Sequence, residues 1–184
     1  MTAITTGEIL FKYSVKTGSA GNSTAGTAAG SLGTYMSTTA WTGGSANDLF
    51  DDISGAENAA STVDYRCIFV HNSNAANPLQ NAVAYLSAEV SGGAGIAIAV
   101  DSTAESIISS SSAQALTGTS ETAPGGSVTG LTYSSPTTAG TGIALGTIPA
   151  GHCRAIWIRR TAANSAALSA DGVTLAVTGD TGSL

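Results

Sequence analysis

Positively charged residues are scarce in this sequence. Lysine and arginine together number six among 184 residues, aspartate and glutamate number twelve, and the formal net charge is −6. Proteins that bind nucleic acids or anionic membranes use clusters of basic residues to neutralise phosphate groups. The composition therefore predicts that neither a nucleic acid nor a membrane surface is a partner.

Long apolar runs are also missing. No run approaches the roughly 20 residues that a membrane-spanning helix needs. Residues 1–18 lack the basic start and long apolar stretch of a secretory signal. We therefore expect the protein to be made and kept in the cytoplasm, unless a particle carries it out of the cell.

Cysteine is rare, with only Cys67 and Cys153 in the chain. Two cysteines are too few for a fold held by a disulfide framework, and in a reducing compartment both should remain thiols. The favoured interpretation is that each thiol packs as a small buried hydrophobe. A Cys67–Cys153 disulfide is the main alternative.

Recognisable catalytic, cofactor and metal motifs are missing as well. His152 and Cys153 are adjacent, so on a strand their side chains point to opposite faces, which leaves His71 as a cross-strand partner for Cys153. The glycine-rich stretches lack the lysine and hydroxyl residue of a phosphate loop, and no third histidine completes a zinc site. The sequence predicts a protein that is not an enzyme, with no catalytic residue, cofactor or metal.

An acidic cluster is the remaining candidate for metal binding. Its carboxylates lack the alternating spacing of a calcium loop, so a solvated acidic turn is the favoured interpretation. The residues are Asp48, Asp51, Asp52 and Glu57.

Short β-branched and aromatic runs separated by glycine, proline, asparagine and aspartate dominate the rest of the chain, which has 23 glycines. This pattern predicts an all-β protein with a single antiparallel β-sandwich, of jelly-roll or immunoglobulin-like type. We expect a turn or a short helix within residues 45–62 and a strand, less favourably a helix, at 79–90. The other expected strands cover 7–15, 63–72, 94–101, 127–133, 142–148, 152–161 and 172–180.

Two low-volume segments interrupt this pattern. Residues 16–34 consist mainly of Gly, Ala, Ser and Thr and have little to bury, so we expect an extended arm that is disordered until a partner covers it. This divides the chain into residues 1–35, a strand plus flexible arm, and 36–184, the sandwich. Residues 102–135 form a long excursion of unusual length for a compact domain.

Two strands share a sequence pattern, "YRCIFVHN" from Tyr65 and "CRAIWIRR" from Cys153. Both have apolar side chains on both faces, which predicts central strands with each face covered. The cover could be the arm, the long excursion or another subunit. Exposed apolar patches usually mark interfaces, so we expect a homo-oligomer with an interface formed by Ile68, Val70, Ile156, Ile158, Arg159 and Arg160.

Three stretches resemble a family of small structural proteins of tailed bacteriophages. They are "LFDDISGAENAASTVDYRCIFVHN", "LGTIPAGHCRAIWIRRT" and "LAVTGDT", between Leu49 and Thr181. The resemblance implies a virion protein, most simply a capsid decoration or cement protein on the outer surface of the head, with the host cytoplasm as its location during assembly. It also implies that the partners are the major capsid protein and copies of the chain itself, in a homotrimer.

Two other classes of function remain open. The chain could be a head–tail, tail or fibre component of the virion. It could also be a carbohydrate-binding β-sandwich, for which the loop aromatics Trp41, Tyr35 and Tyr133 are the candidate residues.

Overall fold

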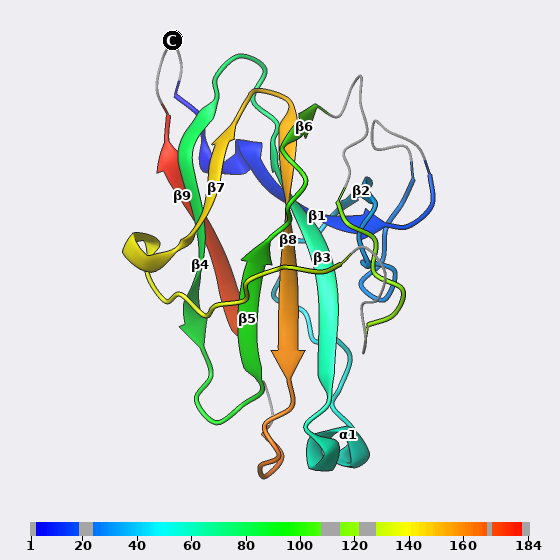
Figure 1. Cartoon of the computed structure of the whole chain (residues 1–184). Helices are drawn as coiled ribbons and strands as arrows, with labels where there is room; N and C mark the ends of the chain where they lie inside the picture. Colours follow the sequence, from blue (N-terminus) through cyan, green and yellow to red (C-terminus); the bar gives the residue numbers. More distant parts are fainter. Residues whose placement is uncertain (1–2, 19–23, 108–114, 122–127, 169–170, 182–184) are drawn as a thin grey trace.

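Two antiparallel β-sheets pack face to face in the computed structural model, which describes residues 3–18, 24–107, 115–121, 128–168 and 171–181 (Figure 1). The larger sheet has the order β2-β1-β3-β8-β5, with the short β6 also paired to β8, and the smaller sheet has the order β7-β4-β9. The predicted antiparallel β-sandwich is confirmed. The strands are β1 (Ile9–Val15), β2 (Tyr35–Ala40), β3 (Val63–Asn72), β4 (Leu79–Glu89), β5 (Gly95–Val100), β6 (Ser106–Ile107), β7 (Ile143–Ile148), β8 (His152–Thr161) and β9 (Val173–Asp180).

The two strands with matching sequences, β3 and β8, lie side by side at the centre of the larger sheet. They pair antiparallel over nine registered positions, with Ile68 opposite Ile156 and Cys67 opposite Trp157. β1 flanks β3, and β5 flanks β8. Both strands are buried along most of their length, as their two apolar faces predicted.

The inner faces of β3 and β8 contribute to the core between the sheets. Ile68, Val70 and Ile156 have no exposed surface and Ile158 is 2% exposed, because they pack against buried residues of β4, β7 and β9 such as Leu145. This placement corrects the sequence-based assignment of these four side chains to an intersubunit interface. The second sheet of the same chain covers them, so they are part of the monomer's own core.

The outer faces of the same strands are covered by the long excursion and by residues near β2. Phe69 and Trp157 are buried against Met36 and Ala115, with Tyr133 packed at the side of the cluster. In Figure 1 the described stretch 128–135 of the excursion crosses in front of the larger sheet. The sequence left three possible covers open: the arm, the excursion and another subunit. In the structure the excursion and the arm region cover this outer face.

The arm is integrated into the domain over the part that the structure describes. Ser31 is fully buried, and its carbonyl oxygen accepts a hydrogen bond from the Cys67 backbone N–H at 2.7 Å. Gly33 has a φ of 91°, and a Cβ at this position would lie 2.0 Å from the carbonyl oxygen of Leu116. Residues 24–34 therefore pack closely, in contrast to the loose arm expected, while residues 19–23 lie outside the described residues.

The expected boundary at residue 35 is also corrected. β1 pairs with both β2 and β3, so Ile9–Val15 is an integral strand of the larger sheet and not part of a separate N-terminal region. Low side-chain volume suggested the boundary, but backbone hydrogen bonds from both flanking strands incorporate this segment.

Two of the other expected elements form and one does not. Helix α1 (Gly55–Ala60) forms where a turn or short helix was expected, and Ser54 and Glu57 complete a capping box at its start. β4 is a strand, as favoured. No strand forms over residues 128–133, where only the neighbouring Ser134 makes an isolated bridge to Ile98. Two short 3₁₀ turns, η1 (Thr6–Glu8) and η2 (Ala139–Thr141), complete the fold.

Candidate functional site

Of Cys67, Cys153 and His71, only Cys153 and His71 are neighbours in the structure. His71 and Cys153 are direct cross-strand neighbours on β3 and β8, on the outer face. Both are buried, at 7% and 1% exposed, and neither ring nitrogen of His71 has a hydrogen-bond partner within the described chain. The geometry therefore lacks the hydrogen bond between base and thiol that would activate a nucleophile.

Cys67 lies too far along the ladder to reach Cys153. Cys67 is opposite Trp157, whereas Cys153 is opposite His71, so the two positions are four residues apart in register. This corresponds to about 13 Å between Cα atoms, while a disulfide needs roughly 7 Å or less. An intramolecular disulfide cannot form in this fold, and both residues are buried thiols.

Both thiols should be unreactive in the folded protein. Burial raises the pKa of the Cys67 thiol well above its usual range, and the Asp101 charge adds to this effect. Native protein at neutral pH should therefore resist a thiol reagent such as DTNB and should release two equivalents of reactive thiol only after unfolding. Replacing either cysteine with alanine should cost about 1 kcal/mol. Rapid labelling of native protein would contradict this placement.

His71 should make folding stability depend on pH. Burial, with help from the positive charge of Lys12, lowers the pKa of His71 from 6.5 to about 4. Between these pH values the unfolded chain binds a proton that the folded chain does not, so stability present above pH 6.5 is lost as the pH falls towards 4. The loss should amount to about 3 kcal/mol.

Urea unfolding of the wild type and His71→Asn at several pH values from 7 to 4 measures this effect. The variant should show a smaller decrease in stability over this interval, because it lacks the titrating ring. His152→Gln, which removes the chain's other histidine and keeps His71, is measured alongside for comparison. An equal decrease in wild type and His71→Asn would show that other groups are responsible.

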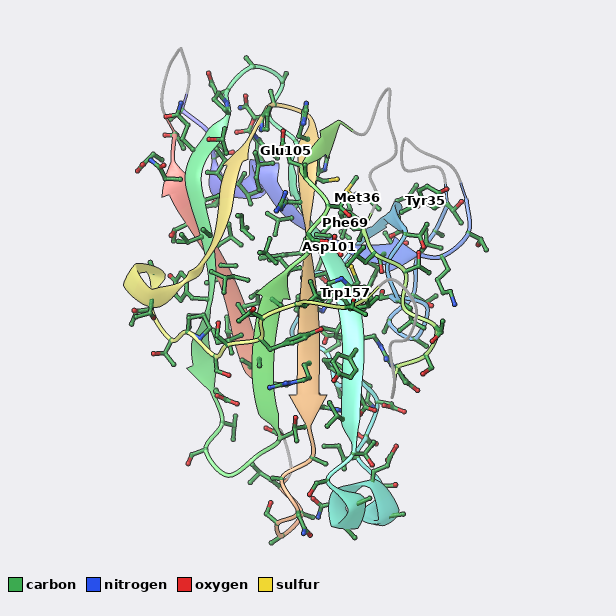
Figure 2. All side chains as sticks on the ribbon, in the orientation of Figure 1. Tyr35, Met36, Phe69, Asp101, Glu105 and Trp157 are labelled. Atoms are coloured by element: carbon green, nitrogen blue, oxygen red, sulfur yellow. The ribbon has the colours of Figure 1, made fainter. Side chains whose placement is uncertain are left out.

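Asp101, which the sequence analysis did not single out, is the most thoroughly bonded buried carboxylate of the described structure. It has no exposed surface, and it accepts hydrogen bonds from Trp157 Nε1 at 2.7 Å and from the backbone N–H groups of Leu116 and Thr103 at 2.9 and 2.8 Å. Figure 2 shows Asp101, Met36, Phe69 and Trp157 gathered on the same side of the larger sheet. Asp101 therefore links the central strand β8 to the excursion that covers its outer face, and both of its carboxylate oxygens accept hydrogen bonds.

Two buried arginines fasten the segment after β2 to the inner face of the larger sheet. Arg66 donates from Nε to the Leu49 carbonyl oxygen at 3.1 Å. Arg160 pairs with the buried Asp64 at 2.6 Å and with Asp51 at 3.2 Å. Both guanidinium groups also lie over the Phe50 ring, at 5.3 and 4.8 Å from its centroid. The surrounding segment is thus held at several points.

Arg159 and Arg160, both assigned to an interface from the sequence, have different surroundings. Arg160 is 7% exposed and is committed to ion pairs within its own chain, which corrects its assignment to an intersubunit surface. Arg159 is half-buried and lies 4.9 Å from the centroid of the Tyr133 ring. Its place in an interface stays a prediction.

An open cleft of about 1040 Å³ lies at the end of the sandwich that carries α1, the lower end in Figure 1. Its walls come from residues within 41–58, 86–96, 163–168 and 171–175, and it also borders Ile158 and Arg160. Trp41, Asp48 and Asp51 belong to the first wall. The segment fastened by Arg66 and Arg160 is therefore one side of the cleft.

Of the three aromatics proposed for carbohydrate contacts, Trp41 alone lines this cleft. Tyr35 starts β2 on the edge of the larger sheet. Tyr133 packs edge-on against Tyr65 with centroids 5.8 Å apart, and burial raises its pKa. The structure thus does not bring the three together into one aromatic surface.

The described residues contain no group of three or more His, Cys, Asp or Glu side chains that could hold a metal ion. None of their helices is long and apolar enough to cross a lipid bilayer. Comparisons of the chain with protein-family models, with curated proteins and with solved structures find no match.

Proposed function

We propose that this protein is a non-enzymatic structural component of a tailed-phage virion, most simply a decoration or cement protein that binds and stabilises the outer surface of the head. The proposal starts from the resemblance of three stretches between Leu49 and Thr181 to small phage structural proteins. The β-sandwich is compatible with it, since the resemblance implied a small β-rich domain.

The observation that best supports a bracing role is the double cover of the central strands. One face of β3 and β8 is buried by the second sheet and the other by the excursion and the arm region, all within one chain. Asp101 then joins the excursion to the sheet, and Arg160 joins the segment after β2 to it. A domain fastened on both sides resists deformation, which is the property that a brace needs.

We propose the major capsid protein and copies of this chain as the partners, with a homotrimer favoured because capsids offer three-fold positions. The inner-face isoleucines are not available for these contacts. Among the described residues the large hydrophobics that remain exposed are Val90 and Leu168, at 39% and 44%. We therefore expect contacts with the shell to be made mainly by polar and small side chains.

Electron cryomicroscopy of phage heads with and without the protein tests the proposal. Heads assembled without it should lack surface density at three-fold or quasi-three-fold positions, and added purified protein should restore that density and raise the temperature at which heads release DNA. Density confined to the neck, tail or fibres would overturn the decoration role in favour of another virion component. Failure to associate with any virion part would overturn the proposal entirely.

A further inference from the structure

Strand β9 forms one edge of the smaller sheet, and its outer side has no hydrogen-bonded neighbour among the described residues. The Leu86 N–H of β4 donates to the Pro136 carbonyl oxygen and not to β9, so Leu86 and its partner Leu175 are a non-hydrogen-bonded pair. The backbone groups of Leu175 therefore point away from β4. Because these groups alternate sides along a strand, those of Val173 and Val177 point the same way. An open row of N–H groups and carbonyl oxygens thus runs along β9.

The other three sheet edges are protected against pairing. Ile98 of β5 exchanges two backbone hydrogen bonds with the excursion, at 2.8 and 3.0 Å. Thr38 of β2 donates its N–H to a carbonyl oxygen of the arm region at 2.8 Å, and the pairing of β7 shifts register next to Gly146, where φ is 77°. Proteins protect edges with covering segments, bulges, proline or lysine, because an unprotected edge pairs with another chain. β9 has neither proline nor lysine, and the extra residue of each register shift in its pairing lies in β4.

The open edge of β9 is one wall of the open cleft. Val173 and Leu175 line this cleft, and so do Val90 and Leu168, the two exposed large hydrophobic side chains of the described structure. Exposed apolar side chains that gather at one place usually mark a surface that another molecule covers. An extended polypeptide fits both features, because its backbone can pair with β9 while every second side chain contacts the apolar residues.

The charge of the cleft restricts the sequence of such a polypeptide. Asp52, Glu89 and Asp171 are exposed, so their charges act on an incoming chain. A surface of this kind attracts lysine and arginine and repels acidic segments. In all, five carboxylates and one guanidinium line the cleft, namely Asp48, Asp51, Asp52, Glu89, Asp171 and Arg160.

A second copy of this chain has no suitable basic strand among its described residues. Its net charge is −6, which opposes its approach to an acidic cleft. Its Lys16 directly follows β1, and its other basic residues lie in β1, β3 and β8, strands that are already paired within the fold. The occupant should therefore come from a different protein.

We propose that the cleft binds an extended segment of a partner protein, in which basic and apolar residues alternate, as an additional strand on the edge of β9. The backbone of the segment pairs with Val173, Leu175 and Val177. Its apolar side chains contact the exposed hydrophobic residues of the cleft, and its basic side chains pair with the carboxylates. This inference goes beyond the proposed role in the virion and does not depend on it.

The probe is an acetylated and amidated peptide of about ten residues in which lysine and valine alternate, labelled for fluorescence anisotropy with the whole protein. It should bind with an affinity that falls as the salt concentration rises, because the attraction between charges is screened. A peptide of the same length in which glutamate and valine alternate should bind about tenfold more weakly or not at all. N-methylation of all lysines or of all valines should abolish binding in at least one case, because one of these sets donates to β9.

Amide hydrogen exchange followed by NMR locates the bound strand. In the free protein the amide protons of Val173, Leu175 and Val177 should exchange readily, and a saturating amount of the lysine–valine peptide should slow their exchange about tenfold or more. The amide protons of Thr174 and Ala176 point towards β4, so they should exchange slowly with and without peptide. This alternating pattern would identify pairing along the edge of β9.

Variants separate the backbone contribution from the charge contribution. Val173→Pro removes one donor from the open edge, at the first residue of an edge strand, where proline is tolerated. It should weaken peptide binding about tenfold, whereas Val173→Ala, which keeps the N–H, should bind nearly as the wild type does. The double variant Asp52→Asn, Glu89→Gln should also weaken binding. Asp180→Asn is its control, because it removes a charge from an exposed residue outside the cleft.

Three results would overturn the proposal. The lysine–valine peptide could fail to bind, the glutamate–valine peptide could bind equally well, or binding could leave the exchange of Val173 and Val177 unchanged. The exchange measurement uses the wild-type protein, so it decides the question even where Val173→Pro fails to fold. None of these results bears on the role in the virion, since the electron microscopy tests that role separately.

Discussion

Replacing Asp101 with alanine should lower the free energy of unfolding by about 4 kcal/mol or more. The substitution leaves the buried Trp157 Nε1 without its acceptor, and it also removes the acceptor of the part-buried backbone N–H groups of Leu116 and Thr103. An unsatisfied buried donor costs roughly 1–3 kcal/mol, and bonds to a charged acceptor lie at the upper end. A loss of this size is a large part of a typical domain's stability.

Urea unfolding of Asp101→Ala, Asp101→Asn and Trp157→Phe measures the effect and divides it. Asparagine retains one acceptor oxygen, so it should cost less than alanine. Trp157→Phe removes one donor and leaves the carboxylate its two backbone partners, so it should also cost less. If Asp101→Ala lost under 1 kcal/mol, the covering segment would not depend on this carboxylate.

Ile156→Asp should prevent folding altogether. Ile156 has no exposed surface and pairs with Ile68 in the core between the sheets. A carboxylate there would have to be buried without a partner or protonated, and either costs several kcal/mol in addition to the lost packing. The total approaches or exceeds the 5–15 kcal/mol by which domains are usually stable.

Circular dichroism and size-exclusion chromatography distinguish this result from an interface effect. Thr178→Asp, on an exposed position of β9, introduces the same charge and should leave the fold intact. Ile156→Val should cost only about 1 kcal/mol. A folded, monomeric Ile156→Asp protein would restore the interface interpretation that the packing now excludes.

The strand pattern of this protein was readable because side chains alternate along a strand. The two-sided apolar character of Tyr65–Asn72 and Cys153–Arg160 predicted central strands with both faces covered, and β3 and β8 are such strands. The same pattern could not say what provides the cover. The sequence pattern is the same whether a second sheet of the same chain or a second subunit covers the strand. The pattern therefore could not decide whether Ile68 and Ile156 lie in the core or at an interface.

The packing of residues 24–34 was misjudged for a related reason. These small residues have little apolar surface of their own, which argued for disorder. In the structure small size is what allows residues 24–34 to pack close to the sheet, with Gly33 against Leu116 and Ser31 buried beside β3. Low side-chain volume is compatible with either outcome, and only the shape of the neighbouring surface decides between them.

The sequence by itself determined the all-β class, the central position of the two matched strands and the burial of their apolar side chains, because these follow from local periodicity and residue type. Tertiary structure alone decided that Asp101 meets Trp157 and Leu116, that Arg160 meets Asp51, and that Trp41 and Asp48 share one cleft. These pairs are separated by as many as 109 residues, as for Arg160 and Asp51. Such contacts depend on strand order and register, which are properties of the whole sandwich and leave no local pattern in the chain.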